Sequence, residues 1–279
     1  MPESSLERMF SVLELVDEKG HVSGMDEMLA VLPLTRSTLY RYVRVLTDFG
    51  LLAPTGGGGY ALGPRIIELD YNIRARDPLI LASHPLMLEL TQATPGIALL
   101  LRRYRDKVLC VHQVHGAVGF VSTYERGRAR SLLRGAASRV ILANMPTQKV
   151  SALYAADPAG FAEAGLGDTL RAVRAGLRAI RQRGWDSSQG QFKPGVTGIA
   201  APIFSDGHVL GSLCLTVGRI GIAKAEEAEI AGRVTFCAQI LSTGPAAKGR
   251  AGSPPPSPAA VDAPMAEPQR EVRVRVYPA

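Results

Sequence analysis

The sequence contains only three cysteines and no long uninterrupted apolar run. Cys110, Cys214 and Cys237 are scattered, and an odd set without closely spaced pairs predicts reduced thiols rather than a disulfide framework. A membrane-spanning helix requires about 18 consecutive apolar residues. The N-terminus also lacks the basic, apolar and small-residue pattern of a secretory signal. These absences predict a cytoplasmic protein without a membrane partner.

Motifs that would indicate an enzyme are missing too. The chain has no Gly-x-Ser-x-Gly nucleophile elbow and no His-Glu-x-x-His zinc motif. The glycines at positions 56–59 are not followed by the Gly-Lys-Ser/Thr of a phosphate-binding loop. Cys110, His112 and His115 resemble a metal-ligand set, but on a strand the two histidines would point to opposite faces. We therefore expect no catalytic residue, no metal and no cofactor.

What is present fits a globular protein of two domains: 279 residues, 46% of them hydrophobic and 20% charged. The net charge of +7 favours polyanionic partners, but residues 1–76 hold eight Lys/Arg and ten Asp/Glu. The basic excess lies later, around residues 102–107, 126–139 and 171–183. Net charge alone therefore does not select the N-terminus as a nucleic-acid binder, and local arrangement has to decide.

The N-terminal region predicts three helices and a hairpin. A helix over residues 5–18 starts at Ser4 or Ser5, and a second starts at Ser23, where Glu27 supports the cap. The third helix is capped by Thr35 and ended by Gly50. Two short apolar pieces, 51–53 and 60–62, then flank a glycine-rich turn as in a hairpin. This order predicts a winged helix-turn-helix domain over residues 1–63.

The third helix has two distinct faces. At about 100° per residue, one face carries apolar side chains for the core, namely Leu39, Tyr42, Val43, Leu46 and Phe49. The other carries hydroxyls and arginines, which suit phosphates and base edges in the DNA major groove. A solvated polar face is the alternative. The candidate DNA-binding residues are Arg36, Ser37, Thr38, Tyr40, Arg41 and Arg44, with Gly57 and Gly58 at the hairpin tip. These two glycines allow close approach to DNA, or simply form a turn.

The remainder predicts a linker helix over residues 64–78, which helps to hold two subunits together, and an α+β domain over residues 79–243. In that domain, hairpins turn near 103–107 and 205–207, and helices occupy 79–93, 140–145, 151–155, 169–183 and 225–242. Residues 244–279 are rich in Pro, Ala, Gly and Ser and predict a disordered tail of unknown purpose.

Several segments resemble the isocitrate-lyase-regulator (IclR) family of bacterial transcription factors, across roughly residues 5–242. They are RSTLYRYVRVLTDFGLLA, YALGPRIIEL, ERGRARSLLRGAASRVILANMP and GWDSSQGQFKPGVTGIAAPIFSDGHVLGSLCLTVG. The resemblance implies a GAF-like effector domain that binds small organic acids, and a homodimer or a dimer of dimers. It also implies an effector-binding set: Gly119, Ser122, Ala136, Ala137, Ser188, Gly198, Cys214 and Thr216.

The chain departs from the family at residues 131–140. Many members have Pro-Leu-His-Ala-x-x-x-Gly-Lys-Ala there, whereas this chain reads SLLRGAASRV, so the family's usual effector preference is not carried over to this chain. Arg134, beside small residues, is a candidate partner for an effector carboxylate, or else a surface or interface arginine. Cys214 and Thr216 share one face of their strand. Both suit a pocket wall, and packing alone also explains Cys214.

These observations predict a sequence-specific, DNA-binding transcriptional regulator. A small organic acid, which the family resemblance suggests is aromatic, controls its binding to double-stranded operator DNA. A metabolite sensor that acts through protein contacts without DNA is the first alternative, supported by the acidic balance of residues 1–76. A small-molecule enzyme is the second, and it would need a catalytic constellation that the sequence does not contain.

Overall fold

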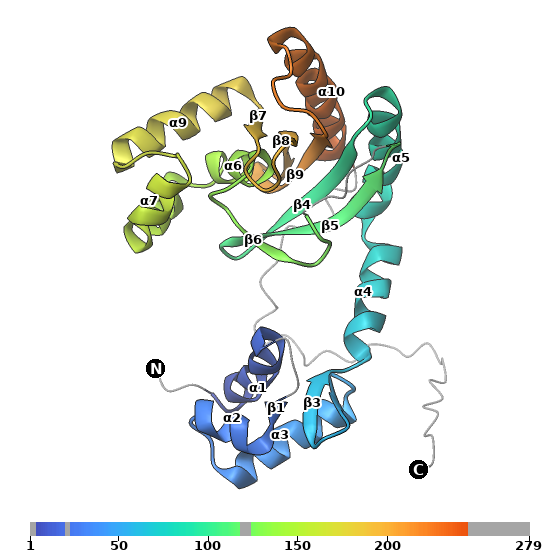
Figure 1. The fold of residues 1–279 in the computed structure, drawn as a ribbon, viewed down its shortest axis with the longest axis vertical. Coiled ribbons are helices and arrows are strands. Elements are labelled where there is room, and N and C mark those ends of the chain that lie inside the picture. Colours follow the sequence, from blue (N-terminus) through green and yellow to red (C-terminus); the bar gives the residue numbers. More distant parts are fainter. Residues whose placement is uncertain (1–3, 20–22, 118–123, 245–279) are drawn as a thin grey trace, which may run out of the picture.

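The computed structural model describes residues 4–19, 23–117 and 124–244. The chain forms a small N-terminal lobe and a larger C-terminal lobe, and the helix α4 (Arg65–Arg76) runs from one to the other (Figure 1). Within the described residues, no helix combines the length and apolar character that crossing a bilayer requires. The predicted tail lies outside the described residues, apart from Gly244.

The N-terminal lobe contains α1 (Ser5–Lys19), α2 (Met25–Val31), α3 (Arg36–Asp48) and a three-stranded sheet in the order β1-β3-β2. The strands are β1 (Ser23–Gly24), β2 (Leu52–Pro54) and β3 (Gly59–Leu62). Side chains of Val12, Met28, Leu39, Leu46 and Leu52 form its buried core. Because the core draws on all three helices and the hairpin, the lobe is a winged helix-turn-helix, as predicted.

Local capping signals explain where two of these helices begin and where α3 ends. Ser4 Oγ accepts a hydrogen bond from the amide of Glu7 (3.2 Å), and the Glu7 carboxylate accepts one from the amide of Ser4 (2.7 Å). Thr35 Oγ1 accepts from the amide of Thr38 at 3.3 Å and caps α3. Gly50, with φ +69°, follows its C-terminus. The predicted caps of α1 and α3 are confirmed.

Two predictions for this lobe are wrong. Ser23 does not cap α2: it pairs with Tyr60 in the sheet, the helix begins at Met25, and Glu27 forms an ion pair with Lys19. Phe49 does not join the core face of α3. It lies just beyond the last helical residue, where the backbone has left helical geometry (φ −84°, ψ 0°), and 71% of it is exposed.

The C-terminal lobe is built on a six-stranded antiparallel sheet in the order β6-β5-β4-β9-β8-β7. Its strands are β4 (Ile97–Tyr104), β5 (Lys107–His115), β6 (Ala129–Ser131), β7 (Asp186–Gln189), β8 (Thr197–Ser205) and β9 (His208–Val217). The two predicted hairpins, β4–β5 and β8–β9, are confirmed. Sequence reasoning missed β1, β6, β7 and the short helix α8 (Pro158–Glu163).

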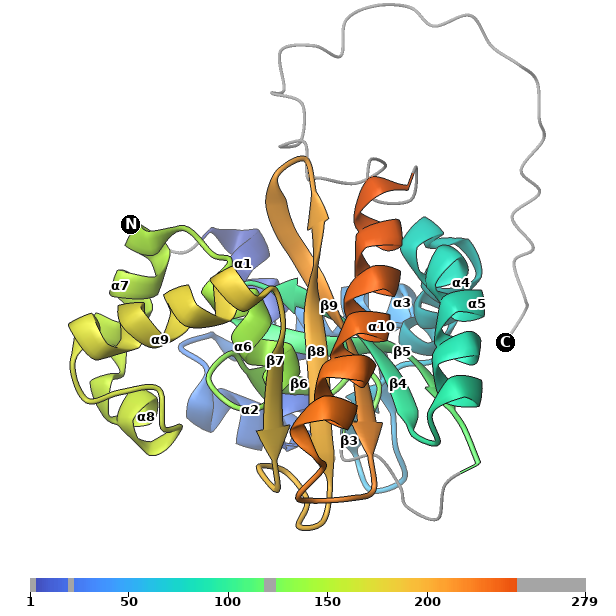
Figure 2. The same cartoon turned by 90° about the horizontal axis from the view of Figure 1, so that it is seen from above.

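Helices cover both faces of this sheet. α5 (Pro78–Ala93) and α10 (Lys224–Thr243) pack on one face, against Leu100, Leu213 and their neighbours. α6 (Ala136–Ala143) packs on the other, with α9 (Leu170–Arg183) against it and α7 (Thr147–Ala156) alongside (Figure 2). Alternate residues of β4 enter the two cores, since successive side chains of a strand point to opposite faces.

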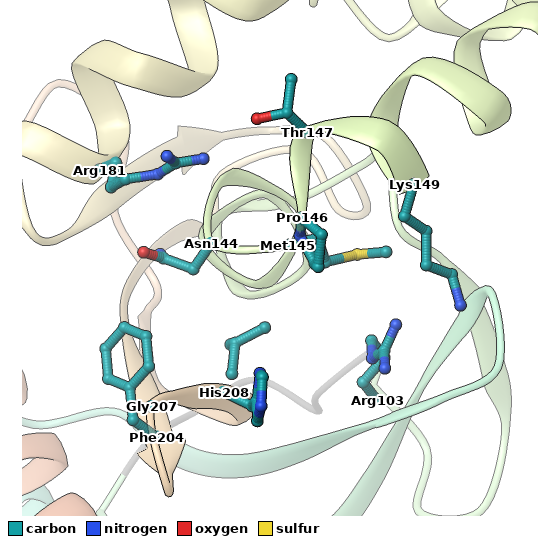
Figure 3. A pocket seen from close by; sticks show the side chains of 11 residues that line it. Arg103, Asn144, Met145, Pro146, Thr147, Lys149, Arg181, Phe204, Gly207 and His208 are labelled. Atoms are coloured by element: carbon teal, nitrogen blue, oxygen red, sulfur yellow. The ribbon is translucent and has the colours of Figure 1, made fainter.

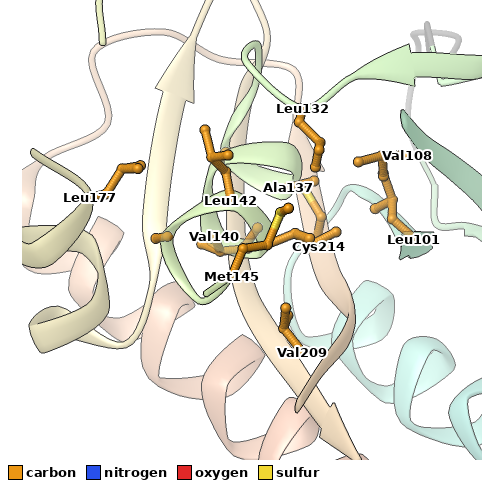
Figure 4. Packing of buried hydrophobic residues seen from close by; sticks show 14 of the residues in the cluster. Leu101, Val108, Leu132, Ala137, Val140, Leu142, Met145, Leu177, Val209 and Cys214 are labelled. Carbon is orange, nitrogen blue, oxygen red and sulfur yellow. The ribbon is translucent and has the colours of Figure 1, made fainter. Parts of the chain in front are cut away.

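The helix α6 is the centre of the second core. All but one of its eight residues are buried, and the side chains of Val140 and Leu142 lie among Met145, Cys214 and Leu132 (Figure 4). The buried hydroxyl of Ser212 on β9 donates a hydrogen bond to the carbonyl of Ala137 (2.8 Å). The N-terminal end of α6 is therefore held in a fixed position over β8 and β9.

Candidate functional site

The polar face of α3 is open to solvent. Ser37, Tyr40, Arg41 and Arg44 are exposed, Tyr40 by 63%, while Leu39, Tyr42, Val43 and Leu46 on the opposite face are buried. The N-terminal lobe therefore holds this helix by its apolar side alone. A docking duplex would meet hydroxyl, phenol and guanidinium groups, which are the groups that contact phosphates and base edges.

Existing contacts divide the predicted DNA-binding residues into two sets. Arg36 forms an exposed ion pair with Asp26, and the Thr38 hydroxyl accepts a hydrogen bond from Thr35 (2.8 Å) within the helix cap. Nε of Arg44 lies 3.8 Å from the Asp48 carboxylate. Such exposed ion pairs are weak, so a phosphate can replace them at little cost. The Thr38 hydroxyl, in contrast, already takes part in the N-terminal cap of α3.

A hollow of about 230 Å³ separates α3 from the β2–β3 hairpin. Tyr40 and Arg44 line it from the helix, together with Thr47, and Tyr60 lines it from β3. At the hairpin tip Gly57 and Gly58 have φ values of +108° and +82°, and a side chain there would meet no atom within 4 Å. Thr47 and Tyr60 are absent from the predicted set because only the folded hairpin brings them to this surface.

On the sheet of the C-terminal lobe, several predicted effector positions lie together beneath the start of α6. Ser188, Gly198 and Thr216 are direct cross-strand neighbours on β7, β8 and β9. A methyl group added to Gly198 would lie 3.5 Å from Ser188 Oγ, 3.7 Å from Cys214 Sγ and 3.8 Å from Thr216 Cγ2. The structure thus brings four of the predicted residues to one small patch.

The N-terminus of α6 closes this patch from above. The amide of Ala136 donates to Ser188 Oγ (3.0 Å), and the amide of Gly135 donates to Oε1 of Gln191 (2.6 Å). Ala137 is buried in the next position. Two side chains thus cap the positive end of the helix, where an anionic ligand is favoured. Gln191 was missed because it lies in an irregular segment that has no periodic pattern.

Two aromatic rings and one arginine stand beside the same helix end. The rings of Tyr124 and Phe192 meet edge to face with centroids 4.9 Å apart. The guanidinium of Arg130 lies 5.9 Å from the first ring centroid and 5.5 Å from the second. Burial raises the pKa of the Tyr124 phenol, which stays protonated at neutral pH. Arg134 is exposed at the surface, so Arg130 is the arginine that accompanies the rings.

The ring cluster explains why residue 135 is glycine. Gly135 has φ +82°, and a methyl group there would lie 2.4 Å from Cε2 of Phe192 and 2.5 Å from the Tyr124 hydroxyl. Both the backbone conformation and the close approach exclude a side chain. The predicted effector residues Gly119 and Ser122 lie outside the described residues.

A buried ion-pair cluster fixes β7 to α6. Asp186 accepts hydrogen bonds from Nε of Arg139 (2.6 Å) and from a terminal nitrogen of Arg183 (2.8 Å). Arg139 also donates to the carbonyl of Ser187 at 2.6 Å. Burial raises the pKa of the Asp186 carboxyl, and the two guanidinium groups oppose that effect. The cluster positions Ser188, which follows directly along β7.

The thiols near this region are packed side chains with little nucleophilic character. Burial raises the pKa of Cys110 and of Cys214 to about 12. His112 pairs with His84 of α5, with Nε2 and Nδ1 3.0 Å apart, and does not meet His115. No group of three or more His, Cys, Asp or Glu side chains in the described residues is arranged to hold a metal ion.

An ion pair connects α4 to the segment that follows Tyr124. The guanidinium of Arg126 donates two hydrogen bonds to the Asp70 carboxylate, at 2.6 and 2.7 Å. Arg74 donates a third at 3.1 Å. The hydrogen bond from Arg126 is the main reason that the pKa of Asp70 lies below its usual value. The helix between the lobes is thus tied to a residue two positions from the ring cluster.

A winged helix-turn-helix joined by one helix to a lobe with an enclosed sheet face is the architecture of transcription factors that carry their own sensor domain. Comparison with known proteins identifies the family. The family described as bacterial transcriptional regulator IclR, C-terminal, matches residues 74–243. The chain therefore belongs to the IclR family of transcriptional regulators, and its C-terminal lobe is the family's effector-binding domain.

Individual relatives are distant in sequence. The HTH-type transcriptional regulator KdgR of Dickeya chrysanthemi is 21% identical over 241 residues, which cover 86% of this chain and 79% of KdgR. KipR of Bacillus subtilis is 22% identical over 182 residues, covering 65% and 72%. Both are regulators rather than enzymes.

The solved structures share the fold. A putative IclR regulator from Silicibacter sp. TM1040 has a TM-score of 0.71 at 20% identity, covering 86% of this chain and 95% of that one. An IclR homologue from Microbacterium hydrocarbonoxydans, complexed with 4-hydroxybenzoate, has a TM-score of 0.64 at 20% identity, covering 86% and 99%. This chain therefore has the fold of these IclR-family structures.

Proposed function

We propose that this protein binds operator DNA through α3 and the β2–β3 hairpin, and that a small organic acid bound beneath α6 controls the binding. The observation that carries the DNA part is the open polar face of α3, with Tyr40, Arg41 and Arg44 exposed over a helix whose other face is buried. Homology to HTH-type regulators supports the same role.

DNA binding is tested by fluorescence anisotropy with duplex DNA from the region upstream of the protein's own gene, at fixed salt. Arg41→Ala or Arg44→Ala should weaken binding by about 1–3 kcal/mol where the side chain reads a base, because a bidentate contact to guanine is lost. Arg171→Ala, an exposed arginine of the other lobe, is the matched control. Unchanged affinity in both α3 variants would reject this interface.

Salt dependence separates the proposal from the alternative of a sensor that acts only through protein contacts. A protein that neutralises phosphates releases counterions, so its DNA affinity falls steeply with increasing salt. The acidic balance of residues 1–76 is the feature that favours the alternative. If operator and unrelated duplex bind equally weakly at every salt concentration, the alternative of a sensor without DNA binding is favoured further.

The chemistry beneath α6 suits a small aromatic acid. The helix N-terminus and Arg130 supply positive potential, Ser188 supplies a hydroxyl, and the rings of Tyr124 and Phe192 supply an apolar wall. Thr216 presents its methyl group to Gly198, because its hydroxyl donates to the carbonyl of Ile97 (3.1 Å). The 4-hydroxybenzoate complex of a structural neighbour agrees with this class of ligand. A calorimetric screen of benzoate derivatives and aliphatic acids would identify the effector.

Arg130 and Arg134 are competing candidates for the carboxylate partner. The sequence predicts Arg134 as the carboxylate partner, whereas the structure places the guanidinium of Arg130 over both rings. Each arginine is replaced by glutamine, and effector affinity and DNA affinity are measured. Loss of effector binding in one variant, with DNA binding intact, identifies the partner. Normal effector affinity in both variants would show that neither arginine binds the effector carboxylate.

The mechanism that we infer is geometric and requires two subunits. α4 has no buried residue, and Ile67 (72% exposed) and Tyr71 (62%) lie on its surface. A helix this short needs packing to be stable, so a second subunit is its expected partner, in a homodimer or a dimer of dimers. A shift of the ring cluster would reach α4 through Arg126 and Asp70, and would change the separation of the two α3 helices.

A further inference from the structure

A cleft lies at the opposite end of α6 from the proposed effector site. It has a volume of about 430 Å³ and opens between the turn of the β8–β9 hairpin, the end of β4, the start of α7 and the side of α9 (Figure 3). Its basic lining residues are Arg103, Lys149, Arg181 and His208. No aspartate or glutamate is among the described residues that line it. The volume is that of an ordinary small-molecule site.

The positive groups in this cleft lack enough negative partners. Nη1 of Arg103 is buried and has no hydrogen-bond partner among the described residues. Nζ of Lys149 has Asp106 at 3.5 Å, and Nε of Arg181 donates to the carbonyl of Ala143 at 2.8 Å. Arg103 and Lys149 are partly buried, whereas Arg181 and His208 are exposed. Like charges gathered in one cleft repel one another, and a bound anion relieves this repulsion. The arrangement therefore provides a site for a ligand of negative charge.

The backbone favours an anion at the same place. The ten-residue helix α7 begins at Thr147, and no side chain caps its N-terminus. Thr147 and the preceding Pro146 both line the cleft, so the positive end of the helix opens into it. Phosphate is an anion that both helix N-termini and arginine groups bind well. Apolar side chains supply the remaining wall: Met145, Phe204 and Val209.

From this juxtaposition we propose that the cleft binds a small organic phosphate. Its phosphate group contacts Arg103, Lys149 and the start of α7, and its organic part lies against Phe204 and Met145 (Figure 3). The ligand differs in class from the organic acid proposed at the other end of α6. The regulator would then respond to two signals, one at each end of a buried helix.

Calorimetry on the full chain tests the proposal, with ribose 5-phosphate, ribose, inorganic pyrophosphate and citrate as probes at constant ionic strength. We expect binding of the two phosphate-bearing probes, no binding of ribose, and at least tenfold weaker binding in Arg103→Gln and in Lys149→Gln. Arg171→Gln removes the same charge from an exposed position of α9 outside the cleft and should bind normally. Thermal unfolding checks that each variant is folded.

Two outcomes would overturn the proposal. Equal affinity in the Arg103, Lys149 and Arg171 variants would show that the phosphate binds elsewhere or only screens the basic surface. Binding of citrate without binding of either phosphate-bearing probe would show that the ligand class is wrong. Lys149→Gln lies at the surface end of the cleft, so it keeps the test valid if Arg103→Gln does not fold.

Discussion

Substitution of Gly135 by alanine should lower the free energy of unfolding by more than backbone strain alone explains, because the new side chain collides with the ring cluster. The residue has φ +82° and ψ +146°, a backbone conformation that costs a non-glycine residue about 1–3 kcal/mol. The new methyl group would also lie 2.4 Å from Phe192 and 2.5 Å from Tyr124. Moving both rings is overpacking, which costs about 1–3 kcal/mol more. The total expected loss is about 2–6 kcal/mol.

Gly127→Ala separates the two contributions. Gly127 has almost the same φ, +83°, but a side chain there would meet no atom within 4 Å. This control should therefore show a backbone cost alone, about 1–3 kcal/mol. The two variants therefore compare an added methyl group that meets the rings with one that meets no atom, at similar φ.

Thermal unfolding by calorimetry is the assay. For a protein of this size about 1 kcal/mol lowers Tm by about 2–4 °C, so Gly135→Ala should lower Tm by about 4–24 °C. The same substitution in a Phe192→Ala background should cost less, because the closest atom is gone. If Gly135→Ala and Gly127→Ala shift Tm equally, the rings do not constrain residue 135 and the described site geometry is wrong.

Three further predictions concern the ion pairs and the buried thiols around the site. Asp70→Asn should change stability by less than about 1 kcal/mol, because the pair with Arg126 is partly exposed, yet it should reduce the effect of ligand on DNA affinity; an unchanged effect would show that the pair transmits nothing. Asp186→Asn should cost about 3 kcal/mol in urea unfolding, since buried guanidinium charge loses its partner; a loss below about 1 kcal/mol would contradict this. With a pKa of about 12, about one in 10⁴ of the Cys110 and Cys214 thiols is ionised at pH 8. Iodoacetamide labelling followed by mass spectrometry should therefore be slow until the protein unfolds and should accelerate as pH rises; rapid native labelling at pH 8 would refute their burial.

The longer helices and the hairpins could be predicted from the sequence because their signals are local. Thr35 and Gly50 bracket α3 through hydrogen bonds and backbone conformations that span a few residues. The alternation in the β8–β9 hairpin likewise depends on neighbouring residues alone. Short elements such as β6 and α8 carry too few residues for a period to stand out.

Misplaced side chains mark the limit of that reasoning. Phe49 fits the apolar period of α3, but the helix ends one residue earlier and the side chain turns to solvent. Ser23 has the chemistry of a helix cap, but pairing with Tyr60 draws its backbone into a sheet. In both cases a partner distant in sequence, or the end of an element, overrides a local preference.

The sequence by itself determined the class of protein, the lobe that presents a polar helix face, and most residues of that face, because amphipathic periodicity and caps are properties of consecutive residues. Only the tertiary structure decided which side chains meet. Strand register brings Ser188, Gly198 and Thr216 together, irregular segments bring Tyr124 and Phe192 to Gly135, and Arg103 and Arg181, 78 positions apart in the sequence, line one cleft. Contacts of this kind depend on the packing of the whole lobe, which no local pattern encodes.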